Sequence, residues 1–190
     1  MRIRLVALLI SAALGLPGCG YESLQQQDEA VKTTWSEVVS QYQRRADLIS
    51  SLAGSVKAGS VKEFAASEQA LIGATEAGAR TGSQQQSAPA VLNDPTAFAS
   101  YQALQEQLTG SLRNLIGLAA SYPQLQSDAN FRDLRAQLAD TEDRIADARN
   151  RYIEAVRTFN TTVRTFPTDL TARVFDFRPK PNLPGPAAGN

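Results

Sequence analysis

The stretch that decides the fold is residues 131–166, FRDLRAQLADTEDRIADARNRYIEAVRTFNTTVRTF. Large apolar side chains recur in it every seven residues, at Phe131, Leu138, Ile145, Tyr152, Phe159 and Phe166. Small or apolar side chains fill the positions between them, at Leu134, Thr141, Ala148, Ala155 and Thr162. This spacing predicts one long helix with a single apolar face. Because a helix cannot bury such a face alone, the rest of the chain must supply partner helices.

Two earlier segments show the same seven-residue spacing and predict the partner helices. The first segment has two recurring sets, Leu24, Val31, Val38 and Leu52, and Trp35, Tyr42, Ile49 and Val56. The second begins at Asp94-Pro95, a typical N-cap and first-turn pair. Its apolar face holds Tyr101, Leu104, Leu108, Leu112, Leu115, Leu118 and Tyr122. The three segments predict an all-α fold, an antiparallel bundle of three to four long helices.

Glycine and proline mark the connections between these helices. Gly54 and Gly59 predict a bend or a short turn, after which residues 61–79 carry the apolar pattern in a shifted phase. Residues 81–93 have the composition of a loop. The short segment that follows Pro123 predicts a hairpin between the second helix and the helix of residues 131–166.

The C-terminal part of the chain is expected to be extended and then disordered. Phe175 and Phe177 alternate as they do in an extended segment, and we expect both to pack across the bundle. Residues 179–190 contain four prolines and two glycines, which predicts a disordered Pro/Gly-rich tail. Removing this tail should leave the melting temperature nearly unchanged.

The N-terminus has the features of an export signal. Two arginines precede an apolar run over residues 5–14, which is shorter than the roughly 20 residues of a membrane-spanning helix. The motif LPGC at residues 16–19 then resembles the lipobox of bacterial lipoproteins, in which the cysteine becomes the acylated first residue. Residues 1–18 are therefore predicted to be a lipoprotein-type signal peptide, and Cys19, the single cysteine, to carry lipid such as palmitate. The alternative is an uncleaved signal anchor with an incidental cysteine.

Composition excludes several classes of function. Nineteen basic and nineteen acidic residues give zero formal net charge, so the chain has no general attraction to nucleic acid. It contains no histidine, which excludes a Ser-His-Asp site, a Cys-His site and a histidine-ligated metal site. No glycine-rich phosphate loop is visible. We therefore predict no catalytic, cofactor-binding or metal-ligating residues and no nucleic-acid partner.

Several blocks of the sequence match those of a known family. They are WSEV at residues 35–38, QRRADLI at 43–49, TExRIAxARxxY at 141–152, and FxFxP at 175–179, with Tyr122-Pro123, Asn130-Phe131, Phe159-Asn160 and Phe166-Pro167. Together the blocks resemble the LemA family of bacterial membrane-associated helical proteins. The resemblance implies a bundle of long helices after an N-terminal hydrophobic segment, and no settled activity. The predicted organisation is a signal peptide over residues 1–18, a LemA-like bundle over residues 19–178 and the tail.

One charged residue lies at a core-facing position. Arg45 falls in an apolar phase of the first helix, and Glu142 lies beside the core-facing Thr141. A contact between Arg45 and Glu142 would fix the register of the two helices, because a desolvated charge needs a partner. In the alternative interpretation, Arg45 extends to the bundle edge and its stem covers apolar surface.

These features favour a non-enzymatic protein of the bacterial cell envelope. The lipid on Cys19 would anchor the bundle to a membrane, facing the periplasm or the cell exterior. The long apolar faces and the missing catalytic residues favour an interaction or scaffolding module with an envelope protein partner that the sequence does not identify. The alternative is a carboxylate-dependent cell-envelope hydrolase, which requires Glu37, Asp47, Glu68 and Glu142 to converge.

Overall fold

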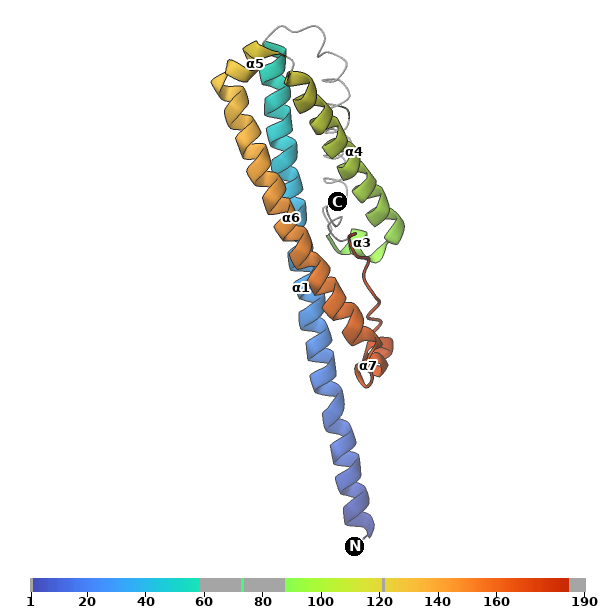
Figure 1. The fold of residues 1–190 in the computed structure, drawn as a ribbon. Helices are drawn as coiled ribbons and strands as arrows, with labels where there is room; N and C mark the ends of the chain where they lie inside the picture. The colour runs from blue at the N-terminus through green and yellow to red at the C-terminus, as the bar shows by residue number, and fades with distance from the viewer. Residues whose placement is uncertain (1, 59–72, 74–87, 121, 185–190) are drawn as a thin grey trace.

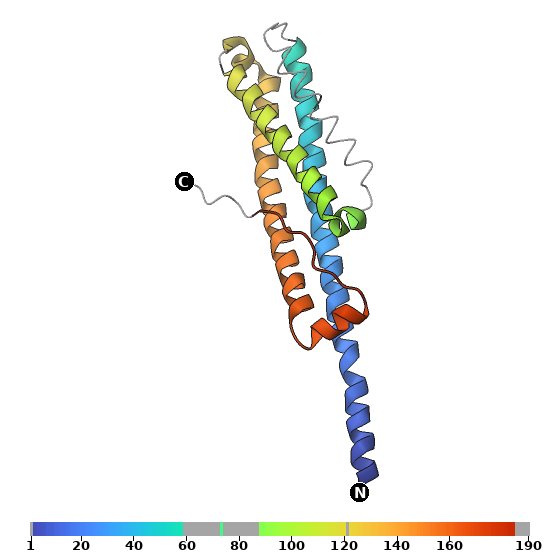
Figure 2. The same ribbon diagram turned by 90° about the vertical axis from the view of Figure 1, so that its right-hand side faces the viewer.

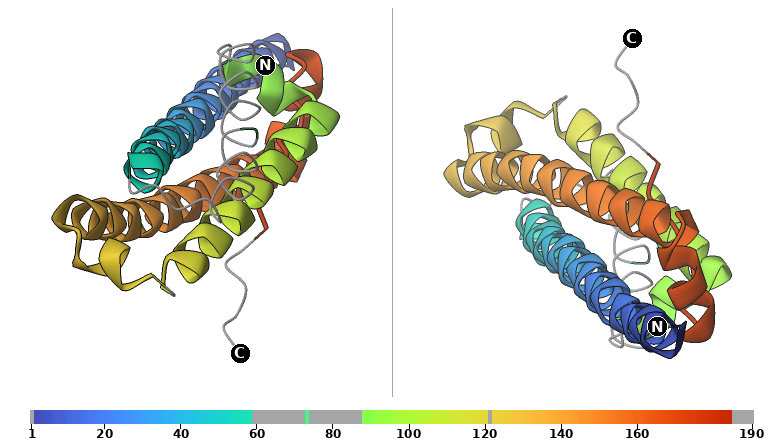
Figure 3. Two further views of the ribbon diagram at one scale, coloured as in Figure 1. Left: turned by 90° about the horizontal axis from the view of Figure 1, so that it is seen from above. Right: turned by 90° about the horizontal axis from the view of Figure 1, so that it is seen from below.

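The computed structural model describes residues 2–58, 73, 88–120 and 122–184. These residues form helices and connecting segments and contain no strand, so the prediction of an all-α fold is confirmed (Figure 1). The helices are α1 (Arg2–Ala58), α3 (Ala88–Asn93), α4 (Pro95–Ala119), α5 (Pro123–Ser127), α6 (Ala129–Arg164) and α7 (Thr168–Val174). The helices α1 and α6 run antiparallel side by side, and α4 lies along them (Figures 1 and 3).

The helix α6 covers most of the stretch that the seven-residue spacing predicts. Its buried residues are Phe131, Leu138, Thr141, Ile145, Ala148, Tyr152, Val156, Phe159 and Val163. Towards the C-terminus, Val156 and Val163 are buried in place of the expected Ala155 and Thr162. A straight helix of 3.6 residues per turn drifts by about 20° per heptad, so over several heptads the buried face moves by one residue. Phe166 lies beyond the helix end and is 77% exposed.

An aromatic cluster joins the three long helices. The Trp35 ring of α1 lies 5.1 Å from the ring of Phe98 and 5.6 Å from that of Tyr101, both on α4. It also lies 5.2 Å from the ring of Tyr152 on α6. Aromatic pairs at these separations stabilise a core beyond the area that they bury. Trp35, only 2% exposed, is therefore a central core residue of the bundle.

The helix α4 begins as its sequence predicts, and the predicted Tyr101, Leu108, Leu112 and Leu115 are buried. The Asp94 carboxylate accepts hydrogen bonds from the backbone N–H groups of Thr96 and Ala97, which confirms the N-cap. Its buried residues are Phe98, Tyr101, Gln105, Leu108, Leu112, Leu115 and Ala119. Leu104, which was expected on the apolar face, is only half-buried. Phe98, Gln105 and Leu112, which stand seven residues apart, lie on the buried face instead. After the short α5, the Asp128 carboxylate caps α6 through the backbone N–H of Phe131.

The connection before α4 is partly helical. Residues 88–93, expected as a loop, form α3, and Val91 and Leu92 are buried in the core at 3% and 1% exposure. Burial of Val91 and Leu92 explains this difference, because it orders a segment whose composition alone predicts a loop. The helix α1 continues through Gly54 to Ala58, so the predicted bend is wrong at Gly54. Gly59 and the predicted helical pattern of residues 61–79 lie outside the described residues, Gly73 excepted.

The prediction of a disordered tail from residue 179 is wrong for residues 179–184. Residues 177–184, the C-terminal strap, cross the bundle beside α6 (Figure 2). Asn160 on α6 accepts a hydrogen bond from the backbone N–H of Lys180 (2.7 Å) and donates one to its carbonyl (2.8 Å). The Tyr152 hydroxyl donates to the Pro181 carbonyl (2.7 Å), and Leu183 is only 5% exposed. These hydrogen bonds and the buried leucine offset the ordering entropy of the strap.

Phe175 and Phe177 do not share one face as predicted. Phe177 is half-buried, and its ring lies 6.3 Å from that of Phe159 in the core. Phe175 is the C-cap of α7 and is 52% exposed. Asp176 between them has a positive φ of 56°, so the chain turns there instead of alternating as a strand does. Both rings lie near the ring of Tyr21 on α1, at 4.6 Å and 6.0 Å, but only Phe177 also reaches the core as predicted.

Candidate functional site

A polar cavity of about 120 Å³ lies between the long helices and the end of the C-terminal strap. Its lining residues are Tyr42, Arg45, Gln102, Gln105, Glu106, Thr109, Glu142, Ile145, Arg149, Leu183 and Pro184. Arg45 projects into this region from α1 and is only 2% exposed. A buried guanidinium needs several hydrogen-bond acceptors, so its partners determine what the cavity can do.

Arg45 binds both of the helices that pack against α1. Its Nη2 donates to Gln105 Oε1 (2.7 Å) and to the Gln105 carbonyl (3.3 Å). Its Nη1 donates to Thr109 Oγ1 (2.8 Å) and to Glu142 Oε1 (3.1 Å). Gln105 and Thr109 belong to α4, whereas Glu142 belongs to α6. One side chain therefore fixes the register of three helices.

The Arg45 network separates two apolar cores. The core nearer α7 includes Trp35 and Tyr152, and the core nearer α5 includes Leu112 and Phe131. The buried polar or charged residues among those described are Arg45, Gln105 and Thr141. All three lie between the two cores along the helices. Hydrogen bonds between buried polar groups at such a position favour one register of the helices over others.

The Arg45 site is also aromatic on one side. The Arg45 guanidinium carbon lies 5.1 Å from the centre of the Tyr42 ring, within the range of a cation–π contact. Burial raises the pKa of Tyr42, and burial likewise raises the pKa of Tyr101. Both phenols are therefore neutral at physiological pH.

Arg45 Nε and Gln102 Nε2 are buried without a hydrogen-bond partner among the described residues, so the cavity retains free donors for a small polar group.

The structure brings Arg45 and Glu142, the pair singled out from the sequence, into contact. The alternative, in which Arg45 extends to the bundle edge, is wrong because the side chain is almost fully buried. Sequence reasoning missed Gln105 and Thr109. A usable signal was present: Gln105 stands seven residues after Phe98 and seven before Leu112, both of which are buried.

A second polar cluster ties the strap to the bundle. Lys180 Nζ lies 3.1 Å from Asp28 Oδ1 and donates to Asn93 Oδ1 at 2.8 Å, so it joins α1, α3 and the strap. Lys32 Nζ lies 2.9 Å from the other carboxylate oxygen of Asp28. Burial alone would raise the pKa of Asp28, but the hydrogen bonds from Lys32 and Lys180 hold that pKa below its ordinary value. Asp28 is therefore ionised in the folded protein at neutral pH.

This cluster makes stability depend on pH. An aspartate with a lowered folded-state pKa stabilises the fold above its unfolded-state pKa of about 3.9, and this contribution is lost as the pH falls through the folded-state pKa. Asp28→Asn is therefore expected to destabilise the protein by about 1 kcal/mol at pH 7 and by much less at pH 3. Melting temperatures of both proteins at both pH values test this. An equal difference at the two pH values would contradict it.

The acidic residues of the hydrolase alternative do not converge where the structure describes them. Glu37 forms an ion pair with Arg151 (2.9 Å), whereas Glu142 pairs with Arg45. The eight residues between positions 37 and 45 rise about 12 Å along α1, so the two carboxylates lie at different levels of the bundle. Asp47 is exposed, and Glu68 lies outside the described residues. The described carboxylates are thus engaged separately with arginine or solvent.

The bundle begins directly after the predicted lipid site. A Cβ atom added at Gly20 would lie 3.2 Å from Thr171 Oγ1, so α1 and α7 approach each other closely there. Leu24, four residues further on, is fully buried. Residues of α1 before this point project beyond the bundle (Figure 1). Within the described residues, no helix combines the length and the apolar character required to span a membrane.

Comparisons with known proteins place the chain in a family. None of the curated proteins compared with it matches significantly. The LemA family, by contrast, matches residues 34–188, most of the chain and nearly all of the bundle. The match includes the two polar residues Arg45 and Glu142 and the whole C-terminal strap. On this evidence, the protein belongs to the LemA family.

Proposed function

We propose that this LemA-family protein is a lipid-anchored component of the bacterial cell envelope that acts as a non-enzymatic interaction or scaffolding module. The observation that carries the proposal is the position of Cys19 relative to the bundle. The next residue, Gly20, lies close to α7, where an added Cβ atom would come within 3.2 Å of Thr171 Oγ1, and the ring of Tyr21 lies 4.6 Å from that of Phe175. A lipid on Cys19 would thus hold the bundle itself at the membrane with almost no intervening chain.

Cleavage before Cys19 agrees with this arrangement. It would remove residues 1–18, of which residues 2–18 belong to the projecting part of α1, and leave 190 − 18 = 172 residues. The remaining helix would begin level with α7, where the bundle ends (Figure 1). Two or more acyl chains anchor a protein stably, whereas one chain does so only marginally.

The bundle would then act as a rigid support. From Gly20 to Ala58, α1 rises about 57 Å, so the end that carries α5 would stand well above the membrane surface. The Arg45 network and the Asp28–Lys180 cluster both connect different helices across the bundle. Such contacts favour one fixed arrangement of helices, which suits a protein that holds a partner at a set height.

Lipidation can be tested in cells. The full-length protein is expected to incorporate radiolabelled palmitate and to sediment with membranes. Cys19→Ser is expected to abolish the incorporation, because the serine cannot form the thioether that carries the lipid, and to leave the signal peptide uncleaved. Arg44→Met, a change at an exposed position, serves as a matched control that keeps both properties. Absence of palmitate from the wild-type protein would refute the anchor.

The scaffolding role needs a partner, so it requires a separate test. A photoreactive residue replacing Gln126 of α5, an exposed position, should crosslink a defined envelope protein in living cells. A photoreactive residue at the exposed Arg132 on the neighbouring helix α6 tests a second position. If neither position captures a partner from intact cells, the interaction role fails at this end.

A further inference from the structure

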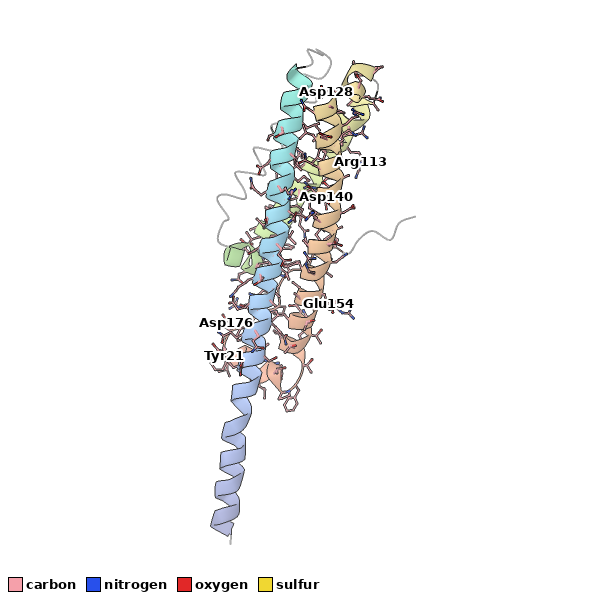
Figure 4. All side chains as sticks on the ribbon, turned by 90° about the vertical axis from the view of Figure 1, so that its left-hand side faces the viewer. Tyr21, Arg113, Asp128, Asp140, Glu154 and Asp176 are labelled. Atoms are coloured by element: carbon pink, nitrogen blue, oxygen red, sulfur yellow. The ribbon has the colours of Figure 1, made fainter. Side chains whose placement is uncertain are left out.

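The exposed large apolar side chains of the bundle gather at one end. We call them the α7 patch; its members are Tyr21 (37% exposed), Phe166 (77%), Leu170 (54%), Val174 (76%) and Phe175 (52%). Among the side chains that the structure describes, no other large apolar side chain is classed as exposed. Figure 4 places Tyr21 and Asp176, the neighbour of Phe175, close together where α1 leaves the bundle. Exposed apolar clusters of this kind mark interaction sites.

The helix α7 presents apolar residues on the side that faces away from the bundle. Ala172, only 2% exposed, and Thr171 pack towards α1 and α6. Leu170 and Val174 are four residues apart, so they share one face of the helix, and that face is solvent-exposed. In an ordinary surface helix the outer face is polar. The outer face of α7 is therefore suited to a second apolar environment.

We propose that the α7 patch lies on the surface of the lipid bilayer, an inference that rests on the proposed lipid anchor at Cys19. The bilayer is inferred as the surface that covers the patch because the anchor lies beside the patch. Gly20 lies so close to Thr171 that an added Cβ atom would come within 3.2 Å of its Oγ1, and Tyr21 packs against Phe175, so lipid attached to the preceding residue would emerge beside the patch. A protein partner would have to fit between the patch and the membrane that holds the anchor, whereas the bilayer is already there.

The polar residues around the patch fit the same environment. The side chains of Arg173 and Arg178 are both 80% exposed and extend from the patch region, where they form ion pairs with Asp169 and Asp176. Arginine and tyrosine are suited to the membrane interface, because a long apolar stem or ring can contact acyl chains while the polar end stays among headgroups. The patch would therefore orient the bundle as well as support it, with α5 directed away from the membrane.

A spin label at Val174 tests the contact. Val174→Cys in the full-length chain, processed in cells and reconstituted into vesicles of mixed zwitterionic and anionic phospholipid, adds a free thiol at an exposed position. The thiol of an acylated Cys19 cannot react, so only position 174 takes the label. Molecular oxygen is expected to relax this label several-fold more strongly than a water-soluble nickel complex does. The matched control is Arg113→Cys on the exposed surface of α4, where the nickel complex should dominate (Figure 4).

The outcomes separate the inference from the anchor on which it rests. If the wild-type protein takes up label at Cys19, the Cys19 thiol is free and the lipid anchor is absent. That result would refute the proposed membrane attachment itself. If Cys19 is blocked but the label at position 174 is relaxed mainly by the nickel complex, the anchor stands and the bilayer contact is overturned. Strong dipolar coupling between labels at position 174 on different chains would show that a second copy covers the patch, which also overturns the proposal.

Discussion

Arg45→Met is expected to lower the free energy of unfolding by about 3 kcal/mol. Removing the guanidinium leaves the buried Gln105 side chain without its donor and removes the contact with the Tyr42 ring. The methionine restores part of the apolar volume but none of the hydrogen bonds. Urea unfolding followed by circular dichroism measures the change.

Two neighbouring variants show whether this loss comes from the network. Glu142→Gln should cost less than about 1 kcal/mol, because Glu142 is 39% exposed and glutamine still offers an acceptor. Arg44→Met is a matched control: it removes the same charge from an exposed position and should change stability by about 0.5 kcal/mol or less. If Arg45→Met were no more harmful than Arg44→Met, the buried network would have no part in stability.

Deleting residues 179–190 is expected to lower the free energy of unfolding by at least about 3 kcal/mol, or the melting temperature by roughly 6–12 °C. The deletion exposes the site of Leu183, which alone contributes about 2 kcal/mol by burial. It also removes the backbone partners of Asn160 and the ion pair between Lys180 and Asp28. Thermal unfolding of the two proteins measures the difference.

The matched control for the strap is a shorter deletion. Removing residues 185–190 keeps every described contact of the C-terminal strap, so it should leave the melting temperature within about 2 °C of the wild-type value. Equal melting temperatures for the wild-type protein and the longer deletion would mean that the strap contributes nothing. That result would support the disordered tail that the composition predicts.

The long helices could be predicted because their signal lies in side chains. The spacing of Phe131, Leu138 and Ile145 specifies both a helix and its buried face, and the structure confirms both. The same spacing failed at its far end, where Val163 replaces Thr162 in the core. A fixed seven-residue repeat ignores the drift of a 3.6-residue helix, so the error grows with length.

The C-terminal strap could not be predicted, because its contacts involve the backbone. Asn160 binds the N–H and carbonyl of Lys180, and Tyr152 binds the carbonyl of Pro181, groups that leave no trace in the amino-acid sequence. A proline-rich segment has the composition of disorder whether or not a helix supplies partners for it. Leu183 was the one visible apolar side chain, and one leucine is too little evidence for packing.

Only the charged pair of the candidate site, Arg45 and Glu142, could be predicted from the sequence. A charge at a core-facing position, Arg45, requires a partner, and that requirement led to Glu142. Gln105 and Thr109 are neutral and occur equally often on helix surfaces, so nothing in their identity marked them as its other partners. Only the phase of α4 could identify Gln105, and leucines at neighbouring positions made that phase ambiguous.

The proposed lipid on Cys19 would tether to the membrane a bundle that begins at the next residue. Mass spectrometry of the N-terminal peptide, taken from protein extracted from membranes, detects this lipid. The mature chain is expected to begin at Cys19 and to carry a thioether-linked diacylglyceryl group. A peptide that still contains residues 1–18, or that begins at an unmodified Cys19, would refute the lipid anchor.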